Sequence, residues 1–143
     1  MLCRSAEKEI LPFCQKSSVA TLAYMPLEQG LLTGKIGMDR VFKPDEFRNN
    51  DAWNPWHTLA NRQRVLDLLG GWKDLTNKYS CTLAQLVIAW TAAQPGLTHV
   101  LCGARNLAQL NDNAKAGDLK LEAEDIARIH CDVVRLGEPI QKK

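Results

Sequence analysis

Several features that mark other classes of protein are missing from this chain of 143 residues. No apolar stretch approaches the roughly 18 residues that a membrane-spanning helix requires. The first residues, MLCRSAEKEILPFCQKSS, are charged from the fourth position, which is unlike a secretory signal peptide. Lysine and arginine are scattered, and the formal net charge is +2. Neither a membrane nor a nucleic acid is therefore expected as a partner.

Cysteine pairs with metal-ligand spacing are also missing. The sequence has five cysteines, an odd number, and no two of them form a CxxC pair. Neither a disulfide framework nor a metal site is therefore expected, and the pattern fits the reducing cytoplasm. Hydrophobic residues make up 45% of the chain and charged residues 24%. This ordinary globular composition favours one domain over residues 1–143.

Two short apolar segments have the pattern of strands. Val19–Met25 is apolar on both faces, which predicts a buried strand of a parallel sheet, and Thr98–Gly103 predicts a second strand. Residues 26–56 lack periodicity, and a loop of that length is usually functional or disordered. A sheet of two strands is too small to be stable alone. We therefore predict an α/β chain that forms part of something larger.

The remaining segments have helical periodicity. We predict helices at about Ala6–Lys16, Leu59–Tyr79, Thr82 to Pro95, the few residues after Asn106, and Glu122–Leu136. Gly70 and Gly71 weaken the second of these helices by about 1 kcal/mol each relative to alanine. The starts at Thr82 and Asn106 each carry a glutamine three residues later, which predicts capping boxes. The final residues, EPIQKK, are expected to fray.

The segment YMPLEQGLLTGK, from Tyr24 to Lys35, is the first that suggests chemistry. A strand ends there, and a loop punctuated by glycines closes on a lysine. Such a loop can lay backbone N–H groups against a phosphate, with Lys35 as a point charge. It is not a Walker A loop, because Ile36 stands where serine or threonine is required. The alternative is an ordinary turn between a strand and a loop.

The segment LCGARNLAQLNDN, from Leu101 to Asn113, is the second. A strand leads through Gly103 and Arg105 into a helix capped by Asn106, and a helix N-terminus attracts anions. The guanidinium fork of Arg105 suits a ribose phosphate. Polar side chains on the first two turns of this helix have the reach to contact an adenine or a ribose. The alternative is a capped helix with a solvated polar face.

Together these segments resemble the aldo-keto reductase superfamily, most closely its bacterial and potassium-channel-β-subunit-like branch. The pattern of that branch is roughly (Y/W)SPLxxGxLTGK, then an alanine-rich helix ending in AW, then GAxNxxQLxEN. This chain has YMPLEQGLLTGK, TLAQLVIAW and GARNLAQLNDN in the same order. The resemblance covers essentially the whole chain. It implies strands seven and eight, with their helices, of a (β/α)₈ barrel that binds NADPH without a Rossmann motif.

The resemblance also implies a role for each residue of the two segments. Tyr24 would stack on the nicotinamide. The residues implied for the pyrophosphate are Leu27, Gln29, Gly30, Leu31 and Lys35, those for the adenosine 2′-phosphate are Gly103 and Arg105, and those for the adenine and its ribose are Gln109, Asp112 and Asn113. Met25 replaces the usual serine, which removes a hydrogen bond near the cofactor, and Asp112 replaces a glutamate.

The catalytic aspartate, tyrosine, lysine and histidine of the family belong to the first half of the barrel, and no position here matches them. Tyr79 is expected to pack structurally, and His57 is expected to face solvent from the long loop. One interpretation is the cofactor-binding portion of an enzyme that reduces aldehydes or ketones to alcohols, its partners a small carbonyl substrate and a complementing N-terminal half. The alternatives are a truncated, non-catalytic module that binds nucleotide or self-associates, and an inert remnant.

Overall fold

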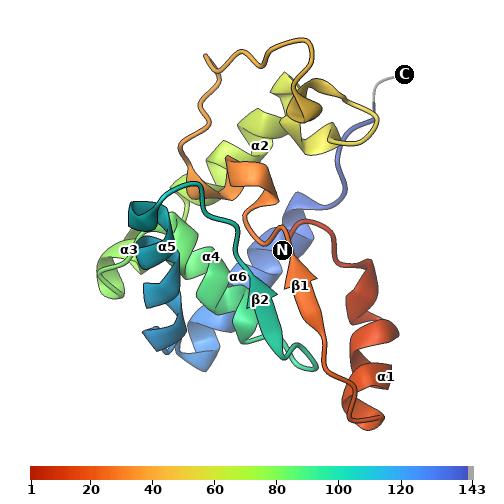
Figure 1. The fold of residues 1–143 in the computed structure, drawn as a ribbon. Helices are drawn as coiled ribbons and strands as arrows, with labels where there is room; N and C mark the ends of the chain where they lie inside the picture. Colours follow the sequence, from red (N-terminus) through yellow and green to blue (C-terminus); the bar gives the residue numbers. More distant parts are fainter. Residues whose placement is uncertain (142–143) are drawn as a thin grey trace.

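The computed structural model describes residues 1–141, which form two short parallel strands and a set of helices (Figure 1). In chain order the α-helices and strands are α1 (Ile10–Lys16), β1 (Leu22–Tyr24), α2 (Leu59–Gly70), α3 (Lys73–Lys78), α4 (Leu83–Ala92), β2 (His99–Leu101), α5 (Leu107–Ala114) and α6 (Ala123–Leu136). Short 3₁₀ segments are η1 (Ser5–Glu7), η2 (Glu28–Thr33), η3 (Phe47–Asn49), η4 (Pro55–His57) and η5 (Lys115–Asp118). The predicted α/β class is confirmed. Over the same residues, no helix is long and apolar enough to cross a bilayer.

The two strands pair in parallel, with Leu22 opposite His99 and Tyr24 opposite Leu101. The prediction that the first strand is buried is wrong, because Leu22 is 56% exposed and Tyr24 is 73% exposed. Helix α4 packs behind β2, whereas no helix or strand of residues 1–141 crosses the front of the pair (Figure 1). A parallel strand is buried only where both of its faces are covered. This layer is therefore open on one side.

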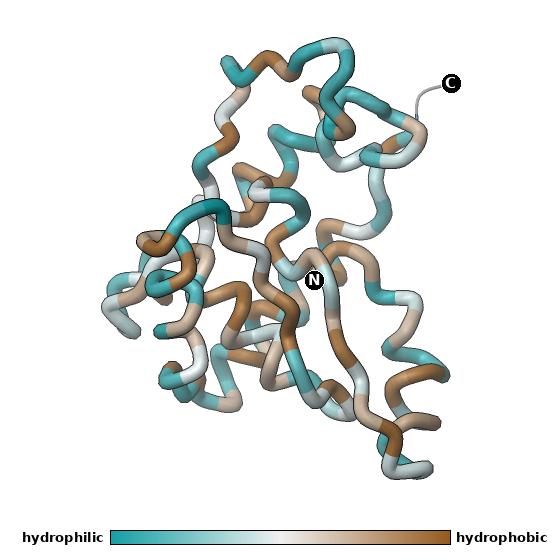
Figure 2. Tube along the Cα trace, in the orientation of Figure 1, coloured by the Kyte–Doolittle hydropathy of each residue, from teal (hydrophilic) through white to brown (hydrophobic). Residues whose placement is uncertain are grey.

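The hydrophobic core lies among the helices. Its fully or nearly fully buried members are Leu31, Leu32, Val65, Leu69, Trp72, Leu75, Leu86, Val87, Trp90, Ile129 and Val133. The indole N–H groups of Trp72 and Trp90 both have acceptors: Trp72 donates to Asp132 at 3.0 Å, and Trp90 donates to the carbonyl of Ile126 at 3.1 Å. Hydrophobic residues also lie along both strands, where several of them are exposed to solvent (Figure 2). The helices thus hold the apolar interior, and the sheet lies at its border.

The helix predicted over residues 59–79 is broken in two at Gly71 and Trp72. The Gly71 N–H donates to the carbonyl of Asp67 at 3.2 Å and to that of Leu68 at 3.1 Å, a shared bond common at helix ends. The low helix propensity of glycine favours a break here. The change of direction carries the Trp72 side chain into the core, where it is completely buried.

The first helix is also shorter than predicted, because α1 begins only at Ile10. Pro12 lacks a backbone N–H and is tolerated only within the first turn of a helix, which this start provides. The apolar side chains of α1 stay largely in solvent: Ile10 is 59% exposed and Phe13 is 65% exposed. Like the strands, α1 has an apolar surface that no part of residues 1–141 covers.

The prediction that the C-terminal tail frays is wrong for residues 138–140. The side-chain amide of Asn61, which is completely buried, donates to the Ile140 carbonyl at 2.9 Å and accepts from the Ile140 N–H at 2.8 Å. Arg64 donates to the carbonyl of Glu138 at 3.1 Å. These bonds fix residues 138–140 against α2. The last two residues of the predicted frayed tail, 142–143, lie outside the described residues.

Candidate nucleotide-binding site

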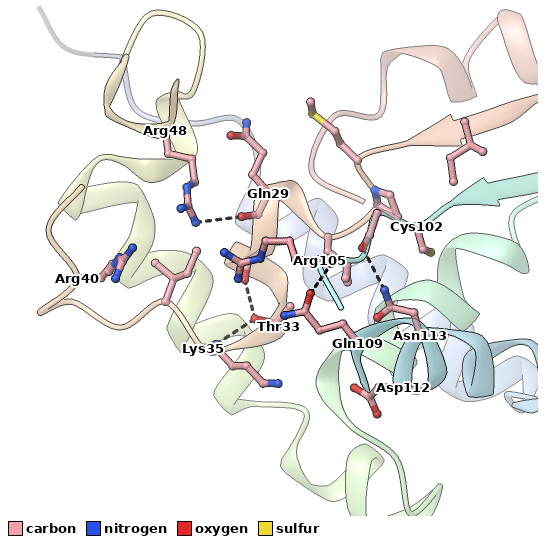
Figure 3. Close-up of a pocket in the computed structure, with 18 residues that line it drawn as sticks. Gln29, Thr33, Lys35, Arg40, Arg48, Cys102, Arg105, Gln109, Asp112 and Asn113 are labelled. Carbon is pink, nitrogen blue, oxygen red and sulfur yellow. Dashed lines mark hydrogen bonds between the residues drawn. The ribbon is translucent and has the colours of Figure 1, made fainter. Parts of the chain in front are cut away.

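The two segments singled out in the sequence meet at one cavity of about 610 Å³ (Figure 3). One wall is the turn that contains η2, and the other is the loop from β2 into α5. The predicted site residues that line it are Leu27, Gln29, Gly30, Lys35, Gly103, Arg105, Gln109, Asp112 and Asn113. Residues distant in sequence thus share one concave surface, which is the first requirement for a common ligand.

Two predicted site residues, Tyr24 and Leu31, do not line this cavity. Tyr24 is 73% exposed at the carboxyl end of β1, just before Met25, which does line the cavity. Leu31 is completely buried in the hydrophobic core. Its side chain anchors the turn from behind, so any contact with a ligand would have to use its backbone.

The first wall depends on an unusual backbone turn. Gln29 and Gly30 both have left-handed backbone angles, with φ values of 52° and 97°. The turn closes through the Gly30 N–H, which donates to the Leu27 carbonyl at 2.9 Å, and through the Thr33 hydroxyl, which donates to the Gly30 carbonyl at 2.7 Å. The Gln29 side chain donates to Asn54, a buried residue of the long loop. This geometry lets the chain line the cavity and then return to the core within a few residues.

The second wall is braced by α5. The Asn106 side chain accepts from the Gln109 N–H at 2.9 Å, which confirms the predicted cap. The reciprocal bond of a capping box is absent, because the Gln109 carbonyl oxygen accepts from the Arg105 N–H at 2.9 Å instead. Asn113 donates to the Gly103 carbonyl at 3.3 Å. Within residues 1–141 these contacts use only the backbone of Arg105, and its side chain extends toward the segment of Gln29 (Figure 3).

Asp112 is held by a residue of another helix. Gln85, which is 6% exposed, donates from its side chain to the Asp112 carboxylate at 2.8 Å and to the Asp112 carbonyl at 3.0 Å. The same Gln85 completes the capping box predicted at Thr82: its N–H donates to the Thr82 hydroxyl at 3.2 Å, and its side-chain oxygen accepts from the Thr82 N–H at 3.0 Å. One oxygen of Asp112 is therefore already engaged, and α5 is fixed to the start of α4.

The charges around the cavity are mostly positive. The cationic side chains that line it are Lys35, Arg40, Arg48 and Arg105, and the lining carboxylate is Asp112. Arg48 forms an ion pair with Glu46 and lies over the Phe42 ring, 4.8 Å from its centroid. Neither Lys35 nor Arg105 has a carboxylate within 4.0 Å among residues 1–141. A concave surface with this charge attracts an anionic ligand.

Sequence reasoning missed Arg40 and Arg48, which belong to the aperiodic loop. The available signal was two arginines on either side of Phe42, a residue that is only 7% exposed and so draws the loop inward. The expectation that His57 faces solvent is wrong. His57 is 3% exposed and its ring meets that of Phe42 edge-on, with 5.4 Å between centroids. Burial lowers the pKa of His57 to about 4.

Tyr79 packs at a helix junction, as predicted. Its hydroxyl donates to the Asp125 carboxylate at 2.5 Å and accepts from the Glu122 N–H at 2.9 Å. The five cysteines are all unpaired. Across residues 1–141 no group of histidine, cysteine and carboxylate side chains is arranged to hold a metal ion.

Residues that follow the carboxyl ends of both parallel strands build this cavity, beside the N-terminus of α5. Barrels of alternating strands and helices place their phosphate sites in just such loops. The arrangement defines the class: an α/β chain of the barrel type with an anion-attracting cavity. The model of the aldo/keto reductase family matches residues 1–131, and the chain belongs to that family, whose members use nicotinamide cofactors.

Particular relatives agree with this assignment. The NADH-specific methylglyoxal reductase of Escherichia coli is 37% identical over 87% of this chain and 37% of its own length. A probable voltage-gated potassium channel subunit beta of Arabidopsis thaliana is 34% identical over 79% of this chain and 34% of its own. A glycerol dehydrogenase structure from Gluconobacter oxydans superposes with a TM-score of 0.84 at 28% identity, covering 99% of this chain and 42% of that one. The chain thus spans about two fifths or less of these relatives.

Proposed function

We propose that this chain is the NADPH-binding portion of an aldo/keto reductase and contributes strands seven and eight of its (β/α)₈ barrel. The complete enzyme would reduce aldehydes or ketones to alcohols. The observation that carries the proposal is that one basic cavity contains both Lys35 and Arg105, neither of which has a carboxylate partner within residues 1–141. A dinucleotide carrying three phosphates would supply the missing negative charge.

The residues present fit such a cofactor. A cavity of about 610 Å³ lies within the usual range of ligand pockets. A methyl group added at Gly103 would meet no heavy atom within 4 Å, so that backbone is open to a closely approaching ligand. Lys35 and the Gln29–Gly30 turn would contact the pyrophosphate, and Arg105 would contact the 2′-phosphate. Gln109 and Asn113, on one face of α5, would contact the adenosine.

The choice of NADPH over NADH rests on Arg105. A guanidinium can make two parallel hydrogen bonds to a phosphate, a gain that NADH, which has no 2′-phosphate, cannot provide. One relative is described as NADH-specific, so the preference has to be tested within this chain. Bound nicotinamide supplies the hydride for carbonyl reduction. The residues of this chain would bind and orient the cofactor, with Tyr24 against the nicotinamide once the remainder of the barrel encloses it.

The test is a fluorescence titration of the purified chain with NADPH and, separately, with NADH. Replacing Arg105 by alanine is expected to weaken NADPH binding about tenfold or more and to leave NADH binding nearly unchanged. The matched control is Arg135→Ala, because Arg135 is an arginine on α6 with an 80% exposed side chain, outside the cavity. Equal losses for both nucleotides would contradict the assignment of Arg105 to the 2′-phosphate.

A second candidate is a nucleotide-binding module that self-associates. It is favoured by the open apolar layer, in which Leu22, Tyr24 and Leu101 are each more than half exposed. Exposed apolar surface of this kind marks an interface. Light scattering after size exclusion distinguishes these two candidate functions. Association that disappears when an N-terminal half of a relative's barrel is added would support the reductase, whereas a persistent homo-oligomer would support the module.

A further inference from the structure

A second cavity, of about 460 Å³, lies at the N-terminus of α2, outside the roles proposed above. The long loop forms one side and the C-terminal segment forms the other. Its lining residues are Arg40, Val41, Phe42, Arg48, Asn49, Asp51, His57, Thr58, Leu59, Ala60, Arg62, Ile140 and Gln141. Three arginines and one aspartate make this lining net positive. Arg40 and Arg48 also border the first cavity, so the two sites share a wall.

Arg62 brings a buried charge to this cavity. The residue is only 3% exposed, and its guanidinium donates to the carbonyls of Gly37 at 3.2 Å, Arg40 at 2.8 Å and His57 at 2.9 Å. Its Nε has no hydrogen-bond partner in residues 1–141. No carboxylate lies within ion-pair distance in that range, and Asp39 acts on it only from farther away. A buried cation without a counter-ion is costly, so an anion beside Arg62 would be stabilised.

His57 adds a second buried group without a partner. Burial lowers the pKa of His57 and the nearby Glu28 backbone raises it, but neither ring nitrogen completes a hydrogen bond within residues 1–141, although the residue is only 3% exposed. A neutral imidazole carries one N–H donor and one acceptor. Buried donors are almost always paired in native proteins. An unpaired one that borders a cavity therefore points to a ligand.

The start of α2 supplies backbone donors at the same place. Thr58 occupies the cap position, yet its hydroxyl donates to the Pro55 carbonyl at 3.0 Å and accepts from the Asn61 side chain at 3.1 Å, so it does not cap the helix. No acceptor among residues 1–141 takes the N–H groups of Leu59 and Ala60. A helix of this length presents such groups, and the positive end of its dipole, to an anion.

We propose that this second cavity binds a small organic anion of the carboxylate class. Its charged oxygens would lie at the N-terminus of α2, near His57 and Arg62. Its apolar body would lie along Val41, Leu59 and Ile140, which give the cavity more room than a simple inorganic anion needs. The assignment does not depend on nucleotide binding in the first cavity.

The test is calorimetric titration of the nucleotide-free chain with benzoate, and with benzyl alcohol as the neutral analogue of similar shape. Saturable binding of one benzoate per chain is expected, with benzyl alcohol about tenfold weaker or worse. Absence of saturable benzoate binding in a folded sample, checked by circular dichroism, would overturn the proposal. Equal binding of the two probes would overturn it as well, because the site would then not recognise charge.

Two variants localise the binding. Leu59→Pro removes one helix N–H at the first helical position, where proline is tolerated, and is expected to weaken benzoate binding about fivefold relative to Leu59→Ala. His57→Phe removes two unpaired polar atoms and should raise the urea midpoint while weakening benzoate binding about tenfold. A merely structural His57 would give a stability change without a change in affinity. Neither variant should alter the NADPH titration, which separates failure here from failure of the proposed function.

Discussion

The helical layer and the strand layer of this chain are built from similar residues but are completed to different degrees. Trp72 and Trp90 lie at the centre of the helices with their N–H groups bonded and almost no exposed surface. Leu22 and Tyr24, on the strand beside them, are mostly in solvent. The difference shows where stability resides: helices α2, α4 and α6 already bury apolar residues against one another, whereas each strand has only one covered face. The first cavity lies at the boundary between the two layers.

The largest expected effect compares two aromatic residues. Trp90→Ala should destabilise the chain by about 3–5 kcal/mol, because it leaves a cavity in the core and removes the indole N–H bond to the Ile126 carbonyl. Tyr24→Ala should change stability by no more than about 0.5 kcal/mol, because the tyrosine is 73% exposed. Urea unfolding followed by circular dichroism measures both. Similar losses would mean that the strand layer contributes as much as the helices.

A smaller effect is expected from pH at the long loop. The folded-state pKa of His57 is about 4, below its ordinary 6.5, so between these values the unfolded chain binds the proton that the folded chain excludes. Stability should therefore fall as the pH drops from 6.5 to 4, by roughly 2 kcal/mol in all.

Burial raises the pKa of the Glu28 carboxyl, so protonation of Glu28 stabilises the folded chain, which is opposite to the effect of protonating His57. The measurement is therefore the difference between the wild type and His57→Phe in urea unfolding at several pH values. If the two curves ran parallel across this window, the ring would bind its proton equally in the folded and unfolded states, and the buried position of His57 would be refuted.

The smallest expected effect on stability lies at the boundary itself. Gly103→Ala adds a methyl group to open space in the first cavity, so stability should change by less than about 0.5 kcal/mol. NADPH affinity should fall roughly five- to tenfold, because the methyl group occupies room that the ligand needs. Gly117→Ala is the matched control, since Gly117 is equally open but outside the cavity. Equal NADPH affinity in the two variants would mean that the ligand does not approach Gly103.

Local patterns predicted those parts of the fold that depend on local physics. The cap at Asn106 and the capping box of Thr82 and Gln85 are set by hydrogen bonds between residues three apart in the sequence. The two strands were predicted from their apolar composition, although their pairing joins distant segments. The family resemblance supplied the roles of the site residues, which stay predictions, and the structure brings most of them to one cavity.

The parts that escaped prediction depend on contacts between distant segments. The burial of His57 depends on its ring contact with Phe42 and on the hydrogen bond from Arg62 to its carbonyl, which hold the aperiodic loop against the protein. The position of the C-terminal segment depends on the Asn61 side chain, which both donates a hydrogen bond to the Ile140 backbone and accepts one from it. The exposure of the strands depends on what covers them, which no pattern within β1 or β2 encodes.

The double role of Gln85 has a consequence for mutational scanning. This one side chain both starts α4 and holds Asp112, although Gln85 itself does not border the first cavity. A library scored only by nucleotide retention would rank Gln85 among the ligand contacts. A parallel score for abundance in the same cells would show the helix start failing together with the cavity wall, and would remove Gln85 from that list.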